Sequence, residues 1–205
     1  ASLVSVSGVA HAAWTEANTK HFLIYGDMSE AKLRQFADQM ERFDAATRQI
    51  LKATETKPVT IYVVEDIGSV EKLIGRRGVG GFYRPSVHGS FMVIPLKVQG
   101  NNTVTNIGRN IYLHEYAHHM TLSTTGSFYP GWVTEGLAEF FGTATFGDDG
   151  SLTFGLAPTM RTYTIGNANR WTVEELLTSD IRKLKDGESE QRYSRGWSMV
   201  HYLLL

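Results

Sequence analysis

The sequence has 205 residues, enough for one domain with a buried core, and its formal net charge of −1, without a basic run, argues against nucleic acid as a partner. It contains no cysteine, which excludes disulfides, thiolate zinc sites and cysteine catalysis and leaves histidine and carboxylate as the strong metal ligands. No apolar run approaches the roughly 18 residues that suggest a membrane span.

The first thirteen residues are small and apolar, and His11 is their only titratable side chain. Ala10-His11-Ala12 has the small-x-small form of a signal-peptidase site. Residues 1–12 are therefore interpreted either as the remnant of a signal peptide or as a flexible terminus or first strand. In the first case the mature protein starts near Ala13 and is periplasmic or secreted; in the second it is expected in the cytoplasm.

Strands and helices then alternate along the chain. The predicted strands are 21–25, 59–64, 81–84, 90–94 and 151–154, and Pro95 is expected to end the fourth. The apolar spacing from residue 30 to about residue 52 predicts an amphipathic helix capped by Ser29, and Asp66 can cap a short helix that ends at Ile74. This order predicts an α+β domain with a mixed sheet.

A glycine-rich segment, residues 75–81, separates two of these elements. It lacks the Gly-Lys-Ser/Thr ending of a phosphate-binding loop and does not follow a strand, so a nucleotide site is disfavoured. A mobile loop beside a cleft is the preferred interpretation.

The most informative stretch is Ile111–Met120, which contains His-Glu-x-x-His from His114 to His118 without glycine or proline. Thr103 or Thr105 can cap a helix here. On a helix, residues four apart share a face, so both imidazoles can bind one ion. Glu115 lies about 100° round the helix and flanks the ion, where a general base is needed.

A second segment, residues 131–141, supplies carboxylates after a turn. Glu135 and Glu139 are four residues apart, a pattern that is usually a solvated helix face. Here an antiparallel return of the chain would bring Glu135 to the ion as third ligand and leave zinc an open fourth position. Glu139 would then accept the free ring N–H of His114.

Together, His-Glu-Tyr-Ala-His and Trp-Val-Thr-Glu-Gly-Leu-Ala-Glu-Phe resemble the gluzincin metallopeptidases, above all bacterial peptidase-MA-like domains and, more distantly, the aminopeptidase N group. The resemblance is strong over about residues 105–145. It implies a zincin-like, thermolysin-like fold with the sheet over the motif helix and a helical C-terminal part. It also implies one Zn²⁺ ion, with Glu135 as the third ligand.

A third fragment, Tyr193-Ser-Arg-Gly196, resembles the Tyr-x-x-Gly segment of that aminopeptidase group, in which the tyrosine hydroxyl stabilises the tetrahedral intermediate. That role maps onto Tyr193; the alternative is a tyrosine that merely begins a core helix. The sequence ends inside this apolar helix without a C-cap signal, as a truncated helix would.

The Gly-x-Met-Glu-Asn segment with which those aminopeptidases hold a free amine is absent, and residues 89–94 contain no acid. This departure weakens an aminopeptidase assignment. An apolar edge strand at 89–94 could instead pair with an extended peptide, as in an endopeptidase.

The remaining histidines are poorer ligand candidates. His119 points away from His118 on a helix, and the others have no ligand-spaced partner and are interpreted as structural or surface residues: His11, His21, His88 and His201. Thr172 and Glu175 form a capping box that opens a short scaffold helix.

The sequence thus predicts that residues 13–205 form a single zincin-like peptidase domain. Zn²⁺ held by His114, His118 and Glu135 would activate water, Glu115 would act as general base and Tyr193 would stabilise the oxyanion of a peptide or protein substrate. The alternative is a non-catalytic zinc-containing binding module on a zincin scaffold. The retained Glu115 argues against it, because a structural site needs no base.

Overall fold

The computed structural model describes residues 14–54, 57–98, 101–102, 106–125, 129–166, 171–180, 183–184 and 188–205. The expected processing site at residues 10–12 and the expected cap at Thr103 or Thr105 lie outside these residues. No helix in the described part of the chain is both long and apolar enough to cross a membrane.

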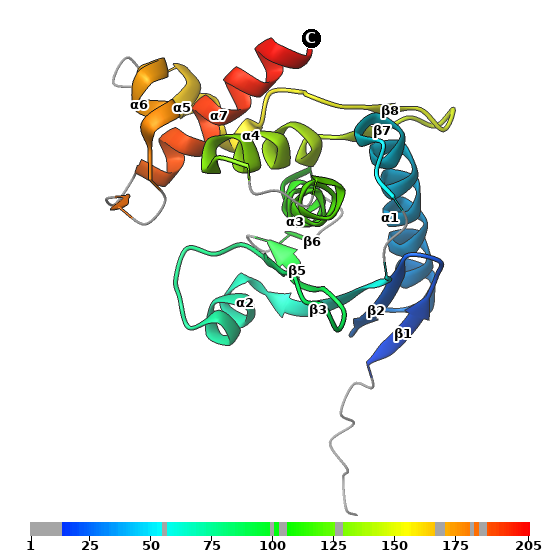
Figure 1. Cartoon of the computed structure of the whole chain (residues 1–205). Coiled ribbons are helices and arrows are strands. Elements are labelled where there is room, and N and C mark those ends of the chain that lie inside the picture. The colour runs from blue at the N-terminus through cyan, green and yellow to red at the C-terminus, as the bar shows by residue number, and fades with distance from the viewer. Residues whose placement is uncertain are drawn as a thin grey trace, which may run out of the picture.

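A mixed sheet with the strand order β1-β2-β3-β5-β4 forms one layer of the fold (Figure 1). Strands β2, β3 and β5 are parallel, and β1 and β4 run antiparallel to their neighbours. The bounds are β1 Thr15–Asn18, β2 Phe22–Gly26, β3 Val59–Asp66, β4 Phe82–Arg84, β5 Phe91–Val98 and β6 Asn101–Asn102. A separate hairpin joins β7 Thr145–Phe146 to β8 Leu152–Thr153. The predicted α+β class and mixed sheet are confirmed.

Two expectations about the fourth predicted strand are wrong. β5 does not end at Pro95, because Pro95 pairs with Val64 of β3 and the strand continues to Val98. Proline is tolerated there since β4 and β6 pair with β5 on either side of it, at 91–93 and at 97–98. Nor is β5 an edge strand, because β4 pairs with residues 91–93 of β5. The strand at this edge of the sheet is therefore β4.

The helices follow the predicted local signals. They are α1 Glu30–Leu51, α2 Ile67–Ile74, α3 Asn106–Thr125, α4 Gly131–Gly142, α5 Thr162–Gly166, α6 Val173–Thr178 and α7 Glu188–Leu204, with a 3₁₀ turn at Thr159–Arg161. The side chains of Ser29 and Asp66 cap α1 and α2, and the capping box of Thr172 and Glu175 opens α6. These three caps confirm the sequence predictions.

Alternation along the strands separates two apolar clusters. On one face, Ile61 and Met92 join the main core with residues of α1, α3, α4 and α7. On the other face, Val64 and Val93 pack against Val70 of α2. Figure 1 shows α3 nearly end-on between the sheet and α4, so the motif helix is held from both sides.

Glycines allow α4 and α7 to approach closely. A Cβ atom on Gly136 would lie 2.5 Å from the carbonyl oxygen of Gly196, and one on Gly196 would lie 2.7 Å from the carbonyl oxygen of Trp132. Backbone atoms cannot rotate away from such contacts as a flexible side chain can. Because each glycine follows a candidate site residue within three positions, this contact brings Glu135 and Tyr193 to the same region.

Replacing Gly136 or Gly196 with alanine is therefore expected to force the two helices apart. Overpacking of this kind lowers the free energy of unfolding by about 1–3 kcal/mol. Gly166→Ala is the control, since nothing lies within 4 Å of its Cβ position and its φ is not positive. Denaturant unfolding measures all three variants, and equal stabilities for Gly136→Ala and Gly166→Ala would contradict the close approach.

Candidate metal centre

Three donor atoms from two helices meet beside the sheet. On α3, His114 Nε2 and His118 Nε2 lie 3.1 Å apart. On α4, Glu135 Oε2 lies 3.3 Å from the first of these nitrogens and 3.5 Å from the second. Glu135 Oε2 is buried and accepts no hydrogen bond from any residue that the structure describes. The structure thus brings together the three residues that the sequence predicts as ligands.

These separations fit a tetrahedral metal ion. Zinc bonds of about 2.0–2.1 Å place neighbouring tetrahedral ligand atoms about 3.3 Å apart. Two imidazoles and one carboxylate are also the donor set of open catalytic zinc sites, which keep a fourth position free. The group of His114, His118 and Glu135 can therefore hold one such ion.

The electrostatics of the cluster place a proton on His114 and leave His118 neutral in the absence of an ion. Burial alone would lower the pKa of His114, but its close contact with Glu135 and the charge of Glu139 outweigh this effect and raise the pKa to about 9. Burial and the charge of His114 lower the pKa of His118 to about 4. Although burial opposes it, the contact with His114 holds the pKa of Glu135 below its usual value. A bound cation would displace the proton, so metal affinity falls as pH is lowered.

Glu139 takes the position predicted for it, one turn after Glu135. Its Oε1 lies 3.5 Å from Nδ1 of His114, the ring nitrogen that faces away from the donor cluster. A carboxylate there fixes the tautomer of the imidazole and raises its basicity. Glu139 is buried, and it is held in turn by a cation that the sequence did not reveal.

That cation is Arg161, at the end of the 3₁₀ turn. Its Nη2 donates to Glu139 Oε1 at 3.1 Å, and its Nη1 donates to both carboxylate oxygens of Glu190 at 2.7 Å. The guanidinium carbon lies 4.5 Å from the ring centroid of Tyr193. Arg161 thus joins three side chains from α4 and α7. No motif marks it, because its partners lie more than twenty residues away in sequence.

Arg161→Ala is expected to weaken metal binding by about 10-fold or more, in the range typical of residues that support a ligand from behind. Arg161→Lys should recover only part of the loss, because an ammonium group cannot reproduce the planar fork. Arg34→Ala is the control, since Arg34 is exposed and pairs only weakly, at 3.7 Å, with Glu30. Zinc titration with a competing chelator measures the effect, and unchanged affinity in Arg161→Ala would refute this role.

Glu115 flanks the donor cluster without belonging to it. Its carboxylate accepts a hydrogen bond from the backbone of Tyr83 on the edge strand β4, and Gly81 packs against its side chain. Burial raises its pKa to about 7, and a bound dication would lower it again by attraction. Without a bound ion, Glu115 can thus exchange a proton near neutral pH.

Tyr193 of α7 lies next to the donor cluster and lines the same cleft as Glu115. Its ring centroid lies 5.8 Å from that of His114. Burial raises the pKa of its hydroxyl, which therefore stays protonated, and within the described ranges this hydroxyl has no hydrogen-bond partner. It remains available as a donor.

These side chains open onto a cleft of about 440 Å³. His114, Glu115, Glu139, Arg161 and Tyr193 line one part of it, and the glycine-rich loop 76–81 lines another. The volume lies in the range of ligand sites, about 300–1,000 Å³. The expectation that this loop lies beside a cleft is confirmed, and its mobility stays a prediction.

Two other histidines are structural, as predicted. The Nδ1 atom of His119 lies 2.9 Å from the hydroxyl of Tyr83, and burial lowers its pKa to about 4. His21 is buried and contacts Glu41 at 2.7 Å and Asp44 at 3.1 Å. His21, Glu41 and Asp44 are close enough together to hold a metal ion. However, the Asp44 carboxylate already accepts hydrogen bonds from Arg48 and from the hydroxyl of Tyr116. We interpret this trio as a buried ion-pair network that ties α1 to β2 and α3.

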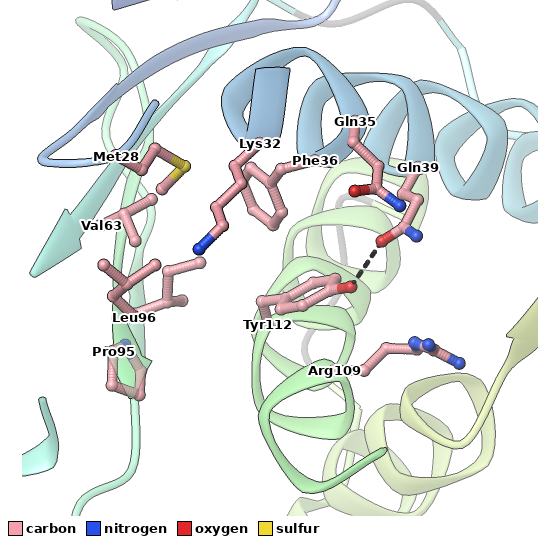
Figure 2. A pocket seen from close by; sticks show the side chains of 11 residues that line it. Met28, Lys32, Gln35, Phe36, Gln39, Val63, Pro95, Leu96, Arg109 and Tyr112 are labelled. Atoms are coloured by element: carbon pink, nitrogen blue, oxygen red, sulfur yellow. Dashed lines mark hydrogen bonds between the residues drawn. The ribbon is translucent and has the colours of Figure 1, made fainter. Parts of the chain in front are cut away.

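A second, smaller pocket lies between α1, α3 and β5 (Figure 2). Apolar side chains such as Phe36, Val63 and Leu96 surround about 70 Å³, and Tyr112 donates to Gln39 across it. This volume is well below that of ligand sites, and no acid lines it. It is a gap in packing, not a competing active site.

One family model matches the second part of the chain. No curated protein sequence matches the chain. Residues 110–205 match the model of a family described as "Protein of unknown function (DUF1570)". The matched range begins within α3 and includes His114, His118, Glu135 and Tyr193 but not the cleft-lining loop 76–81, so the similarity to that family covers the candidate metal centre and α7.

Proposed function

We propose that this chain is a zinc-dependent metallopeptidase of the gluzincin type that hydrolyses peptide bonds. His114, His118 and Glu135 would hold the ion, with Glu139 behind His114. The observation that carries the proposal is Glu115: a buried carboxylate with a raised pKa beside the donor cluster but outside it. A site that only stabilises the fold has no use for such a group, and it would normally close with a fourth protein ligand.

The chemistry divides between the ion and the chain. When bound, zinc supplies Lewis-acid polarisation of the scissile carbonyl and acidifies water. Glu115 receives the proton from the attacking water at its carboxylate and passes it to the nitrogen of the leaving amine. The protonated hydroxyl of Tyr193 donates a hydrogen bond to the oxygen that gains negative charge. Arg161 and Glu139 keep the tyrosine ring and His114 oriented.

Strand β4 offers a place for the substrate backbone. It is the edge of the sheet, and its Tyr83 backbone already contacts Glu115. An extended peptide can add to such an edge through main-chain hydrogen bonds. An endopeptidase is favoured over an aminopeptidase, because the segment that would hold a free amine is absent from the sequence.

The test combines metal analysis with digestion. Purified protein is expected to contain close to one zinc per chain and to cleave casein or a peptide library, and a chelator should abolish cleavage until zinc is restored. Zinc-containing protein that cuts nothing in a broad library would instead support the alternative, a binding module on the same scaffold. Protein without zinc that still cleaves would refute both.

Tyr193→Phe should lower kcat with little change in KM, because the lost hydrogen bond forms mainly in the transition state. A donor of this kind contributes about 3 kcal/mol, close to 10²-fold in rate. Tyr202→Phe is the control, since Tyr202 is an exposed tyrosine on the same helix. Initial rates against substrate concentration separate the two constants, and a purely KM effect would contradict the assigned role.

A further inference from the structure

The glycine-rich loop beside the cleft is anchored at three points. At its start, the backbone N–H of Arg76 donates to the carbonyl of Glu71, and the Glu71 carboxylate accepts from the N–H of Gly78 at 2.6 Å. In its middle, Val79 packs on the apolar cluster beneath α2. At its end, a Cβ on Gly81 would meet Ile111 of α3 at 2.9 Å. These contacts tie the loop to α2 and α3 where its side chains line the cleft.

Two guanidinium groups stand on this loop without a counterion. Arg76 and Arg77 are adjacent, exposed and part of the cleft lining. Neither forms an ion pair with any residue in the described ranges. Two of the three carboxylates that line the cleft, Glu139 and Glu190, are already paired with Arg161. The third, Glu115, is the proposed base.

The free positive charge of the cleft is thus concentrated on one side, at the loop that leads directly into the edge strand β4. A peptide lying along β4 passes this loop, and its side chains alternate toward and away from it. Unpaired arginines at the rim of a cleft attract carboxylates and raise the rate of encounter with them. Guanidinium groups also match carboxylate geometry better than ammonium groups do.

We propose that Arg76 and Arg77 make this cleft selective for peptides that carry carboxylate side chains at the positions beside the loop. The inference rests on the proposed peptidase function for its hydrolytic part, but the recognition can be measured without hydrolysis. An exposed ion pair changes affinity by up to about 5-fold, and two pairs of about 3-fold each multiply to roughly 10-fold in favour of Glu over Gln. Salt should reduce the preference, because the Debye length falls to about 3 Å at 1 M.

The experiment uses two labelled decapeptides, a Thr-Glu repeat and the matching Thr-Gln repeat. Their binding to the full chain, zinc-loaded and carrying Glu115→Gln to prevent turnover, is followed by fluorescence anisotropy at low and at 1 M salt. Hydrolysis of the same pair and of a peptide library by the wild type is measured in parallel. We expect about 10-fold tighter binding of the Glu peptide at low salt and less than about 2-fold at high salt.

The variants locate the charge. Arg76→Ser with Arg77→Ser should abolish the preference for the Glu peptide, and glutamate at both positions should shift it to a Thr-Lys repeat. Arg84→Ser removes one arginine charge from the far end of β4, outside the cleft lining, and should keep the preference. Circular dichroism checks folding, and the salt titration needs no loop variant.

The outcomes separate the two proposals. Equal binding of the Glu and Gln peptides at low salt overturns the selectivity even if peptides are cleaved. So does a loss of the Glu preference in Arg84→Ser as large as the loss in the variant with serine at Arg76 and Arg77. An arginine-dependent preference for the Glu peptide without hydrolysis of any library peptide upholds the recognition and overturns the peptidase assignment.

Discussion

Glu115→Gln is expected to lower peptide hydrolysis by 10²-fold or more, because a positioned general base contributes about 10²–10⁴. The substitution keeps the shape of the side chain, including an oxygen that can accept the hydrogen bond from the backbone of Tyr83. Zinc content and melting temperature should barely change, since Glu115 is not one of the three clustered donors.

Single-turnover rates, metal analysis and thermal melts on the same preparation test this expectation. Glu16→Gln is a matched control, because it makes the same chemical change on the edge strand β1, and Glu16 is not part of the cleft lining. If Glu115→Gln kept full activity, the cleavage would come from another site or from a contaminating protease.

Removing a proposed ligand should have the second large effect. His114→Ala, His118→Ala and Glu135→Ala are each expected to lose most of the bound zinc, because two remaining donors hold the ion poorly. Zinc that binds only the folded state stabilises it by RT ln(1 + [Zn]/Kd), so the melting temperature of these variants should respond little to added zinc. Glu139→Ala should retain the ion with affinity reduced about 10–100-fold.

His119→Gln separates loss of the metal from loss of the fold. His119 is buried beside His118 and contacts the hydroxyl of Tyr83, so its replacement should lower stability. It should nevertheless keep zinc, because it is not one of the clustered donors. Near-stoichiometric zinc in any of the three ligand variants would remove that residue from the ligand set.

What the sequence determined by itself is local. The four-residue spacing of His114 and His118 places both rings on one side of a helix wherever that helix lies. The caps at Ser29 and Asp66 and the capping box at Thr172 depend on residues within a few positions of each, and all three form as predicted. The α+β class followed from the order of such signals. Zinc, catalysis and substrate stay predictions.

What only the tertiary structure decided concerns segments that are distant in sequence. Residues 81–84 take the edge position that the sequence suggested for 89–94, because strand order depends on which neighbours pair across the whole sheet. Arg161 reaches Glu139, Glu190 and Tyr193 only because α4 and α7 meet at their glycines. Such contacts depend on how every element packs at once, and no periodicity or spacing within one segment encodes them.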